Sequence, residues 1–229
     1  MAEAYIVDAV RTAGGRRDGA LRDWHPADLA AETFNALIDR NPNLDPGAVE
    51  DVILGCVMQS GEQCYAFPRN AILASRLPET TPGVAVDRQC GSSQQSIQFA
   101  AQAVMSGTQD VVIAAGAESM TRVPMMSNFT LHQKAGIGEG PLSRRVKERY
   151  ARDDQFSQFE GAEMIAEKHG LSKDALDEFA LSSHRRAAAA IEAGAFANEI
   201  VGVQVDNGIH DTDEGVRRDA SIKGIQGVK

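Results

Sequence analysis

Cys90 is the residue whose type and position are best suited to covalent chemistry. It follows the apolar segment 83–86 and precedes the small residues Gly91, Ser92 and Ser93, an order typical of a strand that turns into a helix. A thiol attacks as the thiolate, and a free cysteine, with a pKa of about 8.5, is only slightly ionised at neutral pH. The unpaired N–H groups of a helix N-terminus favour the thiolate and can bind a carbonyl oxygen as it gains charge. We therefore take Cys90 as a candidate nucleophile; the alternative is a small buried apolar residue.

The other cysteines and the histidines give weaker signals. Cys56 lies in an apolar strand pattern and is predicted to pack in the core, whereas Cys64 lies in a loop and is either incidental or an exposed reactive thiol. The aspartates and histidines are scattered without the spacing of metal ligands, so no metal site is predicted. The five histidines are predicted to be surface or capping residues: His25, His132, His169, His184 and His210.

Alternating strand and helix patterns surround Cys90. The segments 5–10, 49–57, 83–86, 110–116 and 200–205 have the apolar patterns of strands, and 110–116 is apolar throughout, as in a strand covered on both faces. Helical patterns cover 26–38, 70–77, 92–106 and 172–193, with Ser172 as N-cap of the last. Loops and short helices are expected over 119–160, and the tail 207–229 has no recognisable element. The order predicts an α/β protein.

Composition excludes some classes of function. The chain has 229 residues, 23 basic against 32 acidic, and a net charge of −9, which argues against a general nucleic-acid binder. No apolar run reaches the roughly 20 residues of a membrane span, and no basic region precedes the short apolar stretch at the N-terminus, so neither a span nor a signal peptide is expected. With three cysteines and no export signal, reduced thiols and a cytoplasmic location are expected.

Several segments, in order along almost the whole chain, resemble the motifs of the thiolase family. Asp87-Arg88-Gln89-Cys90-Gly91-Ser92-Ser93 resembles its nucleophile motif, and Gly116-Ala117-Glu118-Ser119-Met120 its Gly-Gly-Met-Glu-Ser-Met segment. Weaker matches are Arg11-Thr12-Ala13-Gly14-Gly15 near the N-terminus, Arg69-Asn70-Ala71, and the two segments 161–167 and 213–217, which fit the region that contacts coenzyme A. Any one of these matches is moderate, but together they are specific.

The resemblance implies both a fold and an activity. It implies the N-terminal half of a layered α/β fold, with a mixed five-stranded sheet and helices over 1–118, and a loop domain that covers coenzyme A over 119–229. Cys90 would carry the acyl group in acyl transfer between coenzyme A thioesters, which are substrates, with no permanently bound cofactor. Arg217 would lie by the nucleotide end of coenzyme A, where a planar cation suits adenine or phosphate; the alternative is a solvated charge. A homodimer or tetramer is expected.

This sequence also departs from the family pattern. Asp87 stands where the family usually has Asn, and Ser93-Gln94 replaces Gly-Leu, which we interpret as a subgroup variation that affects substrate choice. The later Asn-Glu-Ala-Phe, Gly-His-Pro and Cys-x-Gly-Gly-Gly motifs, which supply the activating histidine and a second cysteine, have no counterpart. Either another chain carries that C-terminal half, or the polypeptide is longer, or a short protein uses a different partner. Alone, the chain is expected to be inactive.

Three other interpretations were considered. A non-catalytic thiolase-like module that binds coenzyme A or a lipid would also lack the histidine and the second cysteine. A nicotinamide-nucleotide domain is poorly supported, because the glycines at 136, 138 and 140 lack the required spacing and follow no strand. A cysteine peptidase is poorly supported because no histidine motif accompanies Cys90.

Overall fold

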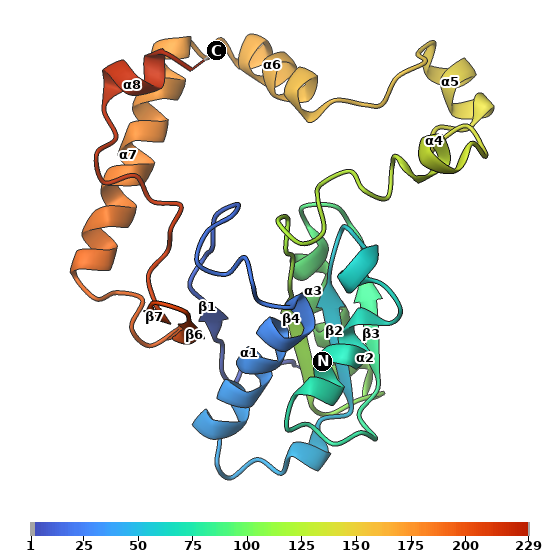
Figure 1. Ribbon diagram of the computed structural model, residues 1–229, viewed down its shortest axis with the longest axis vertical. Coiled ribbons are helices and arrows are strands. Elements are labelled where there is room, and N and C mark those ends of the chain that lie inside the picture. The colour runs from blue at the N-terminus through green and yellow to red at the C-terminus, as the bar shows by residue number, and fades with distance from the viewer. Residues whose placement is uncertain (1–2, 229) are drawn as a thin grey trace. The chain divides into compact units, whose positions relative to one another are not determined.

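The computed structural model describes residues 3–228 and divides into two compact units (Figure 1). The first comprises the chain up to Asn128 together with Ala197–Glu214, and the second comprises Phe129–Phe196 and the residues from Gly215. This division differs from the expected boundary after residue 118. The segment 197–214 belongs with the first unit because it pairs with the N-terminal segment, as in the 2.9 Å hydrogen bond from Trp24 Nε1 to the carbonyl of Gln204.

A parallel sheet of three strands lies at the centre of the first unit. The strands β2 (Asp51–Gly55), β3 (Gly83–Val86) and β4 (Val112–Gly116) lie in the order β3-β2-β4. All of their pairings are parallel. These are three parallel strands of the sheet that the resemblance implies; the described residues do not complete a mixed sheet of five.

Helices cover both faces of this sheet. On one face, α1 (Pro26–Arg40) and α2 (Phe67–Ala74) contribute Phe34, Phe67 and Ile72 to a core with Val52 and Leu54 of β2 and with Cys56, which directly follows that strand. Alternate strand residues point to the opposite face, where α3 (Ser92–Ser106) packs on β2 and β4. The order of layers is therefore helix, sheet, helix.

Three large apolar side chains of α3 are exposed. Ile97, Phe99 and Met105 keep 49%, 40% and 49% of their surface accessible. The strand β4 is only half-buried, in contrast to the expected full burial, because it has a single neighbour, β2, among the described strands.

The predicted opening strand over residues 5–10 is wrong. The structure has only the short strand β1 (Arg11–Thr12), which pairs in parallel with β5 (Ile200–Val201). Tyr5, Ile6 and Val7 belong to no helix or strand and are highly exposed. A strand needs a neighbour for its N–H and carbonyl groups, and no described strand lies beside this segment. The predicted strand over 200–205 is instead divided between β5 and a hairpin of β6 (Val203–Val205) and β7 (Gly208–His210).

The second unit is helical. It contains α4 (Leu131–Ala135), α5 (Arg144–Tyr150), α6 (Gln158–His169), α7 (Lys173–Glu192) and α8 (Ile222–Gln226). Ser172 caps α7 as predicted, by accepting a hydrogen bond from the N–H of Ala175 at 3.2 Å. The helices α6 and α8 were not predicted from the sequence. No helix in the described part of the chain is both long and apolar enough for a membrane crossing.

Candidate active site

The carboxyl ends of the three parallel strands meet at one edge of the sheet. Gly55 at the end of β2 is in register with Val86 of β3 and with Gly116 of β4. Such edges are where ligands bind in open α/β sheets, because loops and helix N-termini converge there. Cys90 lies four residues after Val86, in the turn that leads into α3. The sequence predicted this position, and the structure confirms that α3 begins at Ser92 and that the left-handed Gly107 ends it.

Side-chain hydrogen bonds fix the turn that holds Cys90. The carboxylate of Asp87 accepts a hydrogen bond from the N–H of Gln89 at 2.8 Å. The hydroxyl of Ser92 accepts from the N–H of Arg88 at 2.9 Å and donates to the carbonyl of Gln89 at 2.6 Å. Ser92 is 5% exposed, so these bonds are shielded from water. Asp87, where the family usually has Asn, still supplies the acceptor that this turn uses.

Gln89, directly before Cys90, has a left-handed backbone with φ of 48°. This region is unfavourable for a residue with a side chain, and such strain often occurs where a functional side chain must be presented. Glutamine gives no signal for this conformation, unlike glycine or asparagine, so the sequence analysis missed it. The sharp turn leaves Cys90 exposed to solvent.

The first turn of α3 has no side-chain cap. Its N-cap is Gly91, whereas the N-caps of α6 and α7, Ser157 and Ser172, accept hydrogen bonds from first-turn N–H groups. Cys90, whose thiol is exposed, therefore lies just before a helix N-terminus at which no capping side chain accepts hydrogen bonds from the first-turn N–H groups. N–H groups in this setting stabilise negative charge on a sulfur or a carbonyl oxygen.

The buried Cys56 and the exposed Glu118 lie close to the same edge of the sheet. Cys56 is 1% exposed, so its predicted place in the core is confirmed. Burial, reinforced by the charge of Glu118, raises the pKa of the Cys56 thiol to about 12. The carboxylate of Glu118 accepts hydrogen bonds from the N–H groups of Val57 and Met58 at 2.7 and 3.1 Å and from the amide of Gln63 at 2.8 Å. Glu118 thus ties the end of β4 to the loop after β2, and Cys56 is not a nucleophile.

Four of the five histidine side chains make contacts within the described residues, and one of the four is buried. The ring of His25 caps α1 by accepting from the N–H of Ala27 at 3.2 Å. His210 is only 7% exposed and lies 3.3 Å from the carbonyl of Ala13, so the prediction of a surface or capping role for it is wrong. None of the five histidines lies in the sequence between residues 26 and 131, which contains the Cys90 turn and all three strands.

The two predicted site residues lie in different units. Cys90 belongs to the first unit and Arg217 to the second. Arg217 is exposed, and its N–H donates to Nδ1 of His184 at 3.2 Å, which ties the segment before α8 to α7. Its predicted contact with coenzyme A stays a prediction. Among the described residues, no group of three or more His, Cys, Asp or Glu side chains is placed to hold a metal ion.

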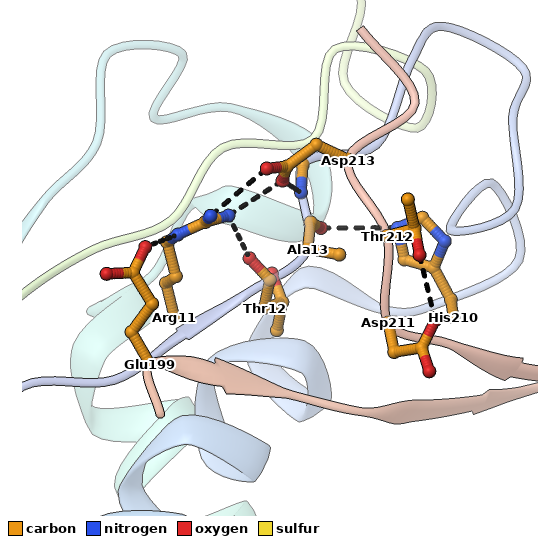
Figure 2. Close-up of polar contacts among 9 residues, drawn as sticks. Arg11, Thr12, Ala13, Glu199, His210, Asp211, Thr212 and Asp213 are labelled. Carbon is orange, nitrogen blue, oxygen red and sulfur yellow. Dashed lines mark hydrogen bonds and ion pairs between the residues drawn. The ribbon is translucent and has the colours of Figure 1, made fainter. Parts of the chain in front are cut away.

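Figure 2 shows a charged cluster that the sequence analysis did not find. Arg11 donates to Asp213 at 2.7 and 3.0 Å and to Glu199 at 2.6 Å. Asp213 also accepts from the N–H of Gly14 at 2.6 Å. Hydrogen bonding to Arg11 lowers the pKa of Asp213. Arg11 and Asp213 both lie in segments that resemble family motifs, and this was the only signal in the sequence for their contact.

Comparison with known proteins shows which family the chain is similar to. The N-terminal domain of thiolases matches residues 4–229. The steroid 3-ketoacyl-CoA thiolase FadA6 of Mycobacterium tuberculosis is 47% identical over 230 residues, which cover 100% of this chain and 56% of that protein. A 3-ketoacyl-CoA thiolase of Erwinia tasmaniensis is 37% identical, with 100% and 58% covered.

A solved structure agrees with these relatives. The acetyl-CoA acetyltransferase of Bacillus anthracis superposes with a TM-score of 0.83 at 29% identity, covering 100% of this chain and 59% of that one. The chain therefore spans a little more than half the length of the relatives it matches. The layered α/β unit is thiolase-like, and the chain belongs to the thiolase family, of which it carries the N-terminal domain.

Proposed function

We propose that Cys90 is the acyl-carrying nucleophile of a thiolase that acts on coenzyme A thioesters. The observation that supports this most directly is the exposed thiol of Cys90 on a strained turn, before the uncapped N-terminus of α3. The names of the relatives, a steroid 3-ketoacyl-CoA thiolase and a 3-ketoacyl-CoA thiolase, support 3-oxoacyl-CoA as the substrate class. A place in fatty acid metabolism is part of the same proposal.

The first step takes place at this turn, and in a complete enzyme the histidine of the C-terminal half would activate the thiol. The thiolate of Cys90 attacks the thioester carbonyl carbon, a carbon–sulfur bond forms, and the carbonyl electron pair moves to oxygen. First-turn N–H groups of α3 are suited to stabilise that oxygen. As the carbonyl re-forms, the bond to the sulfur of coenzyme A breaks, and coenzyme A leaves as a thiolate that takes up a proton. The S-acyl cysteine then passes its acyl group to a second acyl-CoA.

Other parts of the proposal lie outside this turn. The second step requires removal of a proton from the α-carbon of the accepting acyl-CoA, and the C-terminal half of the family would supply that base. Arg217 would bind the nucleotide end of coenzyme A. A homodimer or tetramer and a cytoplasmic location are part of the same proposal; the latter is supported by three cysteines that are all free.

Release of coenzyme A tests the first step. The chain is mixed with acetyl-CoA at a pH of about 8.5, where a free thiol is about half ionised without a base, and free coenzyme A is measured. Wild type and Cys64→Ser should release a stoichiometric amount, while Cys90→Ser should remain at background. Equal release by Cys90→Ser would contradict the proposal. Binding of coenzyme A without any release would favour the non-catalytic module instead.

A further inference from the structure

Two adjacent glycines lie beneath the first turn of α3. Gly55 and Gly116 end β2 and β4 and are register partners in the sheet. A Cβ atom at Gly55 would lie 2.4 Å from both the carbonyl carbon of Ser92 and the nitrogen of Ser93, and a Cβ at Gly116 would lie 2.6 Å from Cβ of Ser93. Ordinary contacts of this kind are 3.4–4 Å. The first turn of α3 therefore rests directly on the backbone of two strands.

Other glycines of the chain lack such close backbone neighbours. A Cβ at Gly161 in α6, or at Gly215, would meet no heavy atom within 4 Å. At Gly83 the nearest atom would be the end of the flexible Ile72 side chain. At Gly55 the obstructing atoms are backbone, which cannot move without moving the helix.

The position of the first turn determines the geometry of the Cys90 turn. The turn starts at Val86, whose carbonyl accepts from the N–H of Cys56 at 3.0 Å and which is therefore fixed to β2. It ends at Ser92, whose carbonyl carbon would lie 2.4 Å from a Cβ atom at Gly55. The hydroxyl of Ser92 also holds Arg88 and Gln89 by hydrogen bonds. A displacement of α3 would move one end of the turn and leave the other in place, so the bonds that keep Gln89 left-handed would be strained.

We infer that Gly55 and Gly116 are positioning residues for Cys90: together they form a seat for the N-terminal turn of α3. The inference rests on the proposed role of Cys90 as nucleophile only for its functional consequence. The seat itself is a property of the packing. Because interiors are close-packed, one added methyl group there must displace the helix rather than fill free space.

The chemistry of the two contacts provides a rescue experiment. Gly116→Ala clashes with the side chain of Ser93, so Ser93→Gly removes the obstructing atom. Gly55→Ala clashes with backbone atoms, which Ser93→Gly leaves in place. Gly161→Ala and Ser93→Gly alone serve as controls. The readout is the rate of alkylation of Cys90 by iodoacetamide relative to Cys64, an exposed thiol in the same protein, followed by peptide mass spectrometry.

We expect Gly55→Ala and Gly116→Ala each to lower the Cys90 to Cys64 rate ratio by about tenfold or more, because a displaced N-terminus of α3 would no longer favour the reactive thiolate of Cys90. Ser93→Gly should restore the ratio in Gly116→Ala and not in Gly55→Ala. An unchanged ratio in both alanine variants would overturn the inference. So would a Gly116→Ala defect, including a failure to fold, that Ser93→Gly does not correct.

A second readout separates this inference from the proposed function. Amide hydrogen exchange of the peptide 87–95 reports on the seat whether or not Cys90 is reactive. It should become faster in Gly116→Ala and return to the wild-type rate with Ser93→Gly. If the exchange follows this pattern while wild-type Cys90 is no more reactive than Cys64, the seat is correct and the nucleophile assignment is wrong. If Cys90 is the faster thiol but exchange does not respond, the seat is wrong.

Discussion

The guanidinium of Arg11 and the carboxylate of Asp213 are joined by two hydrogen bonds, although 202 residues separate them in the sequence. Arg11 also binds Glu199, and Asp213 also binds the N–H of Gly14 (Figure 2). Charged groups thus help to hold the end of the first unit to its N-terminal segment, beside the backbone pairing of β1 with β5. Two-point contact between a planar guanidinium and a carboxylate is among the stronger polar contacts in proteins.

Replacing Arg11 with methionine should destabilise the first unit. The change removes charged hydrogen bonds to Asp213 and Glu199, and we expect the free energy of unfolding to fall by about 2 kcal/mol. Urea unfolding followed by the fluorescence of Trp24, the only tryptophan, reports on this unit. The control is Arg17→Met in the same unit, whose pair with Asp18 is exposed and should contribute less than about 1 kcal/mol. Equal losses in the two variants would show that the Arg11 contact is an ordinary surface pair.

Asp8 should make stability sensitive to acid. Hydrogen bonding to Arg40 lowers the pKa of Asp8 to about 2, against about 3.9 in an unfolded chain. A carboxyl whose pKa is lower in the folded state stabilises the fold above the unfolded value, and that contribution is lost as the pH falls from about 4 through 2. Asp8→Asn should therefore flatten the acid side of the stability curve, and Arg40→Met should flatten it similarly. An unchanged slope in Asp8→Asn would contradict this assignment.

Cys56 should make stability sensitive to alkali. Its folded pKa of about 12 exceeds the value of about 8.5 for an unfolded thiol. The stabilising contribution is complete below the unfolded pKa and is lost as the pH rises toward 12, because only the unfolded state ionises readily. Cys56→Ala should lose less stability between neutral and alkaline pH than wild type does, while Cys64→Ala should behave as wild type. Iodoacetamide labelling of native Cys56 as fast as Cys64 would contradict its burial.

Ser92 should be more important than its neighbour Ser93 for the Cys90 turn. Ser92→Ala removes the hydrogen bonds to Arg88 and Gln89 in a buried position, and we expect a loss of about 1–3 kcal/mol in the free energy of unfolding. Ser93→Ala retains the Cβ atom that contacts the seat and should change stability by less than about 0.5 kcal/mol. Urea unfolding of both variants checks this. A larger effect from Ser93→Ala would mean that the turn is held differently.

Local signals were sufficient for the elements around Cys90. The strand at 83–86 and the helix at 92–106 were predicted with their observed bounds, because a short apolar run, a cluster of small residues and Gly107 mark their ends. The family resemblance, which depends on several motifs, correctly indicated the family and the layered fold. The bounds of the strand and of the helix are properties that neighbouring residues determine.

Long-range packing accounts for what the sequence could not give. Residues 5–10 have a strand-like pattern, but a strand forms only where another strand is available to pair with it. His210 contacts Ala13, which lies 197 residues earlier in the sequence, and Arg11 binds Asp213, which lies 202 residues later. The left-handed Gln89 depends on Ser92 and Asp87 and has no signal in its own residue type.

Mapping the acyl group tests the central claim most directly. The protein is incubated with acetyl-CoA, quenched in acid and digested, and the acetylated cysteine peptides are quantified over time, with Cys64 as the exposed reference thiol. The proposed mechanism predicts that acetylation of Cys90 is at least about tenfold faster than acetylation of Cys64, because the N–H groups of α3 stabilise the oxyanion at Cys90 alone. Equal rates at the two thiols, or acetylation of Cys64 only, would contradict the assignment of Cys90 as the nucleophile.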